Sequence, residues 1–277
     1  MASRMRGDHD RGLHHGVMRG VRGLSYLGRC ERHPRGEIVK SDLYRLRFAY
    51  PKSSRLAFLS HLELSSTIGR SIRRAGLPFA VSQGFARRMR IQFTSALPVG
   101  VSSKAEYFDL FLSDRLDAGV ALERLSRTAP AALRPFEARY VEGSLPALEA
   151  WLDRSSWLLD LGPGLDGNVV DEAIAALCEQ GSFTSMRGEK EKMVDVRAGY
   201  VAHGTAREDE SLMLGLETLL GPNGALRPEA FIRAAFACIG HADALPRYLR
   251  CERTAQHHLD DGTLVDPFQL SSTQFVD

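Results

Sequence analysis

The chain has 277 residues, of which 44% are hydrophobic and 25% are charged, and its formal net charge is +2. These proportions are typical of a globular protein with one large core or two modest ones, and they exclude a fibrous chain. The longest apolar runs, such as residues 157–159, are far too short to cross a bilayer, so we expect no membrane contact and a cytoplasmic location.

The net charge is unevenly distributed along the sequence. Residues 1–42 hold nine Arg and Lys against five Asp and Glu, a net charge of +4, which leaves −2 for the rest of the chain. Because large apolar residues are few at this end, we predict a flexible basic tail over residues 1–41. An arm that touches RNA is the alternative interpretation of the same composition.

The first predicted elements alternate between strand and helix patterns. Residues 44–50 alternate with period two and predict a strand that ends at Pro51. Ser60 is followed by Glu63 and then by an apolar helical pattern, which predicts a capped helix that ends near Gly76. Further strands are predicted at 90–94, 106–112 and 133–141, with a helix at 117–128. This order of elements is that of the split βαβ, or ferredoxin-like, arrangement.

The same order of elements returns in the second half of the chain. The patterns predict strands at 156–161, 211–219 and 248–253, helices at 169–180 and 227–238, and a hairpin or bent strand pair of 183–187 with 192–197. We therefore expect an α+β protein with two ferredoxin-like (split βαβ) lobes and antiparallel sheets. The boundaries are 42–145 and 146–258 for the lobes, after the flexible N-terminal tail, and 259–277 for a loose C-terminal tail.

A stretch without acidic residues is the clearest functional signal. Between Leu64 and Ala105 there is no Asp or Glu. Seven basic residues lie there: Arg70, Arg73, Arg74, Arg87, Arg88, Arg90 and Lys104. The first three share one side of the predicted helix, and the last three arginines follow a Gly-Phe turn with the aromatic Phe85. Arginine binds phosphate and stacks on bases, so this pattern indicates contact with RNA or another anion, although a solvated helix face also explains basic residues.

Several polar residues beside these arginines are candidates for substrate binding. His61 lies in the first helical turn next to Glu63, where it can bind phosphate, act as a base or simply pack. Ser82 and Gln83 can contact a substrate, and Gly84 is expected to supply a positive φ or a close backbone approach. No catalytic residue is predicted beyond the candidate His61.

No cofactor motif is present in the sequence. The four cysteines form no CxxC pair, and there is no Cx3Cx2C triad, phosphate-binding loop, GxGxxG, HExxH or GxSxG. We therefore predict no metal site and no cofactor bound by this chain.

Four motifs together resemble the radical SAM-linked conserved protein family, a domain of unknown function found beside or fused to cobalamin-type radical SAM proteins. They are Phe58-Leu59-Ser60-His61-Leu62-Glu63, Arg73-Arg74-Ala75-Gly76-Leu77-Pro78, Ser82-Gln83-Gly84-Phe85 and Leu97-Pro98-Val99-Gly100. The resemblance covers residues 43–253. The family continues Ser-Gln-Gly-Phe with Asn-Pro-His-Pro-Lys, whereas this chain has Ala86-Arg87-Arg88-Met89-Arg90 and keeps only the last positive charge.

The resemblance implies a partner radical SAM protein, encoded nearby, that carries the SAM, the iron–sulfur cluster and the cobalamin. The leading hypothesis is then an accessory protein that presents RNA or another anionic substrate to that enzyme. In this hypothesis His61 and Gln83 orient the substrate, while the six arginines from Arg70 to Arg90 hold its phosphates. Two alternatives stay open: a metal-independent RNA-processing or RNA-modifying enzyme that uses His61 as a base, and a protein-binding adaptor.

Overall fold

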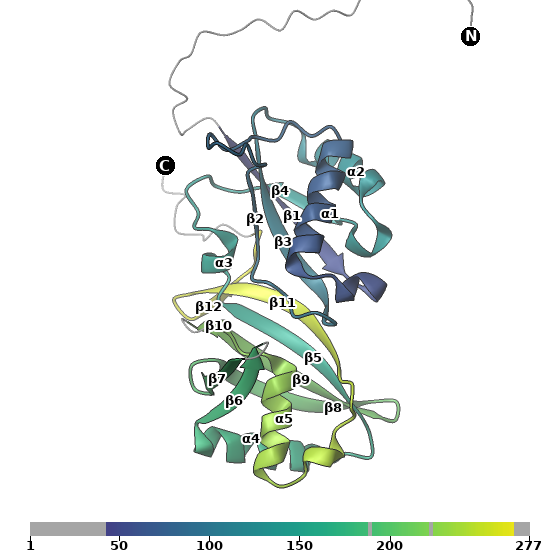
Figure 1. Ribbon diagram of the computed structural model, residues 1–277, viewed down its shortest axis with the longest axis vertical. Helices are drawn as coiled ribbons and strands as arrows, with labels where there is room; N and C mark the ends of the chain where they lie inside the picture. The colour runs from purple at the N-terminus through teal and green to yellow at the C-terminus, as the bar shows by residue number, and fades with distance from the viewer. Residues whose placement is uncertain (1–42, 188–189, 222–223, 269–277) are drawn as a thin grey trace, which may run out of the picture. The chain divides into compact units, whose positions relative to one another are not determined.

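The computed structural model describes residues 43–187, 190–221 and 224–268. The tail predicted at residues 1–41 lies outside this part of the chain. The described residues form a mixed α+β fold with a mostly antiparallel sheet and few helices (Figure 1). The strands of the main sheet follow the order β10-β9-β5-β11-β3-β1-β4, with β2 on β3, β8 on β9 and β12 on β11.

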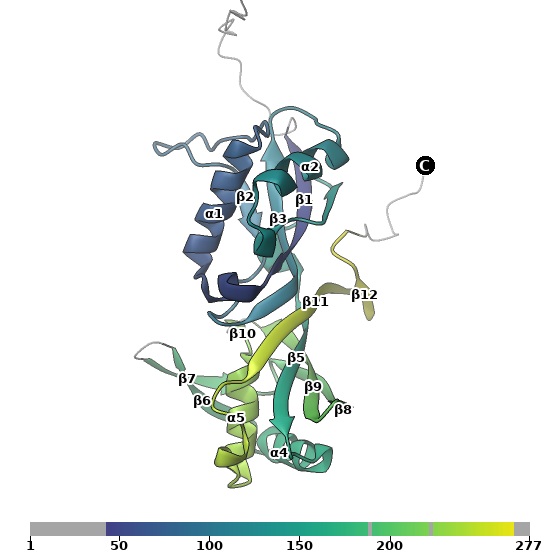
Figure 2. The same ribbon diagram turned by 90° about the vertical axis from the view of Figure 1, so that its right-hand side faces the viewer.

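The N-terminal half of the fold comprises the following elements: β1 (Tyr44–Lys52), a 3-10 turn (Ser54–Phe58), α1 (His61–Arg74), β2 (Ile91–Phe93), β3 (Ser102–Leu112), α2 (Ala118–Thr128) and β4 (Glu137–Tyr140). Strand β1 pairs antiparallel with both β3 and β4, and β2 pairs antiparallel with β3. Alternate β1 residues Leu46, Phe48 and Tyr50 face α1 and α2, which cover one face of the sheet (Figure 2). Pro51 does not end β1, because the strand continues to Lys52 through an irregular register.

The C-terminal half comprises the following elements: α3 (Leu148–Trp151), β5 (Arg154–Pro163), α4 (Gly167–Gln180), β6 (Ser182–Arg187), β7 (Lys190–Asp195), β8 (Tyr200–Glu208), β9 (Ser211–Gly221), β10 (Gly224–Ala225), α5 (Pro228–Cys238), β11 (Arg250–Asp260) and β12 (Thr263–Val265). Strand β5 lies between β9 and β11, antiparallel to both. Strands β6 and β7 form a separate hairpin, as the sequence predicted. Helices α4 and α5 pack on the large core of this half.

Two stretches of this half differ from the sequence predictions. The patterns did not predict β8, whose alternate residues Ala202, Gly204 and Ala206 have weak strand preference and which reaches strand geometry by pairing with β9. The loose tail predicted from residue 259 is wrong for residues 259–265, because β11 continues to Asp260 and turns into β12. Asp261 and Gly262 both have positive φ, 44° and 83°, the requirement of a tight two-residue hairpin turn.

A single pairing joins the two halves of the sheet. Glu252 and Arg253 of β11 pair parallel with Ser102 and Ser103 of β3. Beyond this point β3 pairs with β2 instead, so the sheet divides between β2 and β11. The second face of the N-terminal half is covered by α3 and by Val265, with Phe268 packed against them.

Candidate functional site

Helix α1 begins with a complete capping box. The Ser60 hydroxyl accepts a hydrogen bond from the Glu63 backbone N–H at 3.4 Å, and the Glu63 carboxylate accepts the Ser60 backbone N–H at 2.9 Å. The hydrogen bonds from the Ser60 hydroxyl and backbone lower the pKa of Glu63 below its usual value. Glu63, a predicted substrate contact, therefore serves the helix terminus in this structure.

His61 occupies the first turn of α1 and is partly buried. Its ring meets the ring of Phe93 edge-on, with centroids 5.6 Å apart. His61 also lines a cavity, so it combines packing with access to an open volume.

The first arginine group lies at the opposite end of α1. A helix rises about 1.5 Å per residue, so the 13 steps from His61 to Arg74 separate the two by roughly 20 Å along the axis. The Arg70 guanidinium donates to the hydroxyls of Ser66 and Thr67, at 2.8 and 2.9 Å. Arg70, Arg73 and Arg74 are all exposed.

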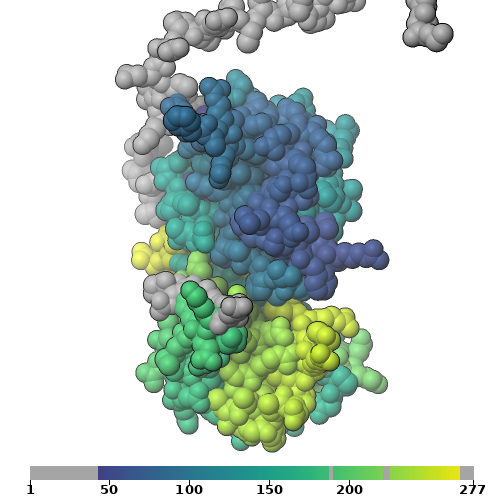
Figure 3. Space-filling model, viewed as in Figure 1, coloured from purple at the N-terminus to yellow at the C-terminus, as the bar shows by residue number. Residues whose placement is uncertain are grey.

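The second arginine group lies on a narrow loop that follows α1. Val81 bridges to Met89, and Ser82 exchanges hydrogen bonds with Arg88, its backbone N–H donating to the Arg88 carbonyl at 2.8 Å. At the tip Phe85 is fully exposed. In the space-filling view (Figure 3) this dark blue loop stands out near the upper left of the molecule.

The remaining residues of this loop differ in how they are held. Gln83, Arg87 and Arg88 are exposed, whereas Arg90 places its guanidinium 4.8 Å from the centre of the Phe111 ring. Gly84 does not have the predicted positive φ, and nothing lies within 4 Å of a Cβ built on it. The expected positive φ at Gly84 is therefore wrong, because the turn is closed by Ser82, whose hydroxyl bonds the backbone at Ala86 and Arg88. The alternative, a close approach of the Gly84 backbone to a ligand, stays a prediction.

We call the stretch that holds the two groups, Arg70 to Arg90, the arginine segment. Within the described residues no ion pair joins any of its six arginines to a carboxylate. The first group thus lies at the C-terminal end of α1, the second lies on the loop that follows the helix, and His61 lies at the opposite end of α1.

A cavity of about 440 Å³ lies beside His61, where the sheet divides between β2 and β11. Its walls are largely apolar, and its polar lining residues are Ser60, His61, Ser95, Glu149, Arg227 and Arg253. The Arg253 guanidinium is 2% exposed and holds the buried Glu106 carboxylate at 2.7 and 2.8 Å. It also donates to the backbone carbonyl of Ser95 at 3.1 Å.

Lys52 adds a second buried cation near this ion pair. It is 2% exposed, and the described residues give its ammonium group no hydrogen-bond or ion-pair partner. Burial lowers the pKa of Lys52, an effect that nearby Glu106 opposes and nearby Arg253 reinforces. Sequence patterns gave no role to Lys52 or Arg253, because each lies in a strand that holds other charged residues.

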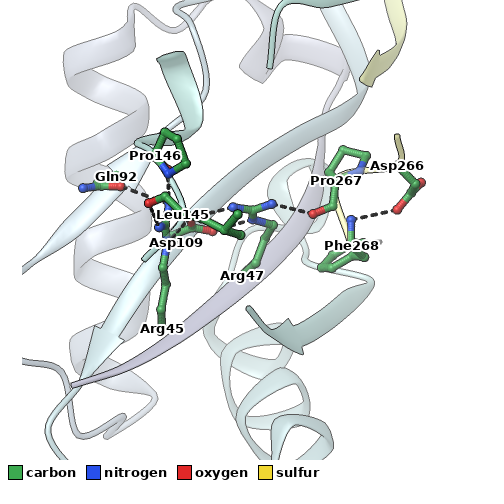
Figure 4. A network of polar contacts seen from close by, with 9 residues as sticks. All are labelled: Arg45, Arg47, Gln92, Asp109, Leu145, Pro146, Asp266, Pro267 and Phe268. Atoms are coloured by element: carbon green, nitrogen blue, oxygen red, sulfur yellow. Dashed lines mark hydrogen bonds and ion pairs between the residues drawn. The ribbon is translucent and has the colours of Figure 1, made fainter. Parts of the chain in front are cut away.

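A second buried ion-pair network lies on the other face of the N-terminal half (Figure 4). Arg45 and Arg47 are neighbours on that face of β1, and both hold the fully buried Asp109 of β3, with Nε to carboxylate distances of 2.7 Å. Arg45 also donates to the carbonyl of Pro146 at 2.7 Å, and Arg47 donates to the carbonyl of Pro267. The network therefore ties β1 to segments that follow it by a hundred residues or more.

Two absences hold for the described part of the chain. No group of three or more His, Cys, Asp and Glu side chains is arranged there to hold a metal ion. No helix among those residues has the length and apolar character needed to span a bilayer.

The fold and the site define an α+β protein with an exposed arginine segment and a separate cavity. The chain belongs to the family DUF2344, described as an uncharacterized protein conserved in bacteria, whose model matches residues 45–228. None of the curated proteins compared with the chain matches it.

Solved structures resemble the chain only distantly. A chain of a Cbf5-Nop10-Gar1 complex is 8% identical with a TM-score of 0.39; the match covers 79% of this chain, which spans only 51% of that one. An unknown protein from Galdieria sulphuraria is 9% identical with a TM-score of 0.23, over 76% of this chain and 98% of the other.

Proposed function

We propose that this protein is an accessory protein that binds RNA and presents it to a separate radical SAM enzyme. The observation that carries the proposal is the arginine segment, with six arginines and no acidic partner among the described residues. A cluster of unpaired positive charge attracts phosphate and releases its counterions on binding.

The geometry of the loop favours single-stranded RNA among anionic partners. Phe85 is fully exposed at the loop tip, and the exposed Arg87 and Arg88 follow it after Ala86. An exposed aromatic ring provides a stacking surface for an unpaired base, and adjacent guanidinium groups bind the neighbouring phosphates. An exposed aromatic side chain lowers the solubility of a protein, and a role in base stacking would explain why Phe85 is exposed.

We also propose that each half is a ferredoxin-like lobe. Support comes from the strand order β4-β1-β3-β2 with α1 and α2 in the first half. In the second half the order β11-β5-β9-β8, with α4 and α5, is the same if the β6–β7 hairpin is treated as an insertion. The arginine segment then comprises the C-terminal end of the first helix and most of the connection to the second strand of the first lobe.

The radical SAM partnership rests on the four sequence motifs that resemble the radical SAM-linked family. We place the SAM, the iron–sulfur cluster and the cobalamin in the partner. In this arrangement the arginine segment holds the RNA backbone, and the partner supplies the chemistry. Affinity capture of the tagged chain from its native cell is expected to recover a radical SAM protein encoded nearby, and recovery of none would contradict the partnership.

RNA binding is tested by the salt dependence of affinity. The full chain is titrated with a fluorescent single-stranded RNA at several salt concentrations, beside an Arg87→Ala/Arg88→Ala variant. Each phosphate contact on a single strand contributes about 0.7 to the slope of log affinity against log salt, so the double variant should lose about 1.4. The matched control is Arg247→Ala/Arg250→Ala, which removes two exposed arginines of the C-terminal half and should bind as the wild type does.

The proposal fails if the wild-type chain shows no salt-dependent RNA binding. It also fails if the Arg87→Ala/Arg88→Ala variant and the control lose the same affinity, because overall charge would then explain the binding.

A further inference from the structure

We infer that the cavity beside His61 binds one nucleotide, taken either from free nucleoside monophosphate or from a strand of RNA. The site is separate from the arginine segment, which lies at the other end of α1. The inference can therefore be tested independently of the function proposed for the arginine segment.

The size and walls of the cavity suit an aromatic base. Its volume of about 440 Å³ lies within the range of small-molecule sites, which are mostly apolar with a few placed polar groups. The lining includes Leu97, Pro98 and Val99 of one loop in the N-terminal half, and Leu226 and Pro228 of the C-terminal half. Both halves of the fold are therefore needed to form the walls.

The polar groups favour a ligand with a negative charge. Arg227 lines the cavity, is exposed and has no described ion-pair partner. It stands at the N-terminus of α5, which no side chain caps, so the helix dipole places partial positive charge there; the acidic residue of this first turn, Glu229, is paired with Arg233. His61 occupies the first turn of α1 on the same cavity. The one carboxylate on the lining is that of Glu149.

The buried charged residues next to the cavity also favour an anionic ligand. Arg253 and Lys52 are two buried cations, and Glu106 is the one buried carboxylate that Arg253 holds. With Lys52 protonated, this group carries a net charge of +1, and its Arg253 lies on the cavity lining itself. A phosphate bound in the cavity would supply the missing negative charge.

The binding is tested by calorimetric titration of the full chain with each of the four nucleoside monophosphates, and separately with a trinucleotide RNA. Two variants change the cavity without touching the buried ion pair. Arg227→Gln removes the exposed cation, and its affinity should fall roughly tenfold or more, as expected for one charge-assisted hydrogen bond. Val99→Trp fills the cavity from an exposed position on its rim and should abolish binding.

The control is Arg124→Gln, an exposed arginine of α2 that does not line the cavity and should leave affinity unchanged. Binding of a free monophosphate that both cavity variants weaken identifies a free nucleotide as the ligand. Binding of the trinucleotide alone, weakened by the same variants, identifies a nucleotide of RNA. The inference is overturned if neither probe binds, or if both cavity variants bind as tightly as the control. The Arg87→Ala/Arg88→Ala variant separates the two sites, because it should retain binding of the free nucleotide.

Discussion

Replacement of Asp109 by asparagine should destabilise the protein more than any exposed substitution. Asp109 is the one carboxylate that balances the buried guanidinium groups of Arg45 and Arg47, and all three side chains are at most 3% exposed. Asparagine keeps the size of the side chain and removes its charge, so two like charges remain buried without an anion. Loss of one partner from a buried ion pair costs about 3–5 kcal/mol.

The cost converts into a measurable change in melting temperature. For a domain of this size each kcal/mol corresponds to roughly 2–4 °C, so we expect the Asp109→Asn variant to melt about 6–20 °C below the wild type. Thermal unfolding followed by circular dichroism measures the difference, and urea denaturation provides the free energy of unfolding independently.

The matched control breaks an exposed ion pair. Glu123 accepts from Arg127 one helical turn away on α2, and both side chains are more than half exposed. Because such pairs contribute roughly 0.2–1 kcal/mol, Glu123→Gln should shift the melting temperature by less than about 4 °C. An Asp109→Asn variant that melts within the range of this control would refute the buried charge balance.

Two further predictions concern a helix cap and a thiol. The Asp117 carboxylate accepts the Val120 backbone N–H at 3.0 Å at the start of α2, so Asp117→Ala should cost about 1 kcal/mol in urea denaturation, and an unchanged midpoint would contradict the capping role. Burial raises the pKa of Cys251 to about 12, so its thiol should stay protonated and resist iodoacetamide at pH 8 in the folded protein. The exposed Cys238 should react under the same conditions, and peptide mapping distinguishes the two; equal labelling before urea is added would show that Cys251 is accessible.

Elements with local signals could be predicted from the sequence. Helix α1 is such a case, since Ser60 and Glu63 mark its start and Gly76, with a φ of 63°, follows its end. The β6–β7 hairpin was also predicted, because its strands are close in sequence. Strand β8 was not, because its conformation depends on pairing with β9 rather than on its own residues.

The two candidate sites differ in the same way, because one could be predicted from the sequence and the other could not. The charge of the arginine segment is a property of contiguous residues and was visible in the sequence. The cavity was not, because Arg253 meets Glu106 across 147 positions and Arg227 comes from yet another element. Nor did any pattern indicate that Arg45 and Arg47 share one aspartate, since strand register fixes that pairing.

The covering of the second face of the N-terminal half has a consequence for the order of folding. Val265 and Phe268 close that face, and the carbonyl of Pro267 accepts a hydrogen bond from Arg47, 220 positions earlier. During synthesis from the N-terminus, β1 and β3 leave the ribosome long before these residues exist. The charged face of the first half therefore stays uncovered until β11 and β12 have been synthesised. Contacts between residues this distant in sequence slow folding.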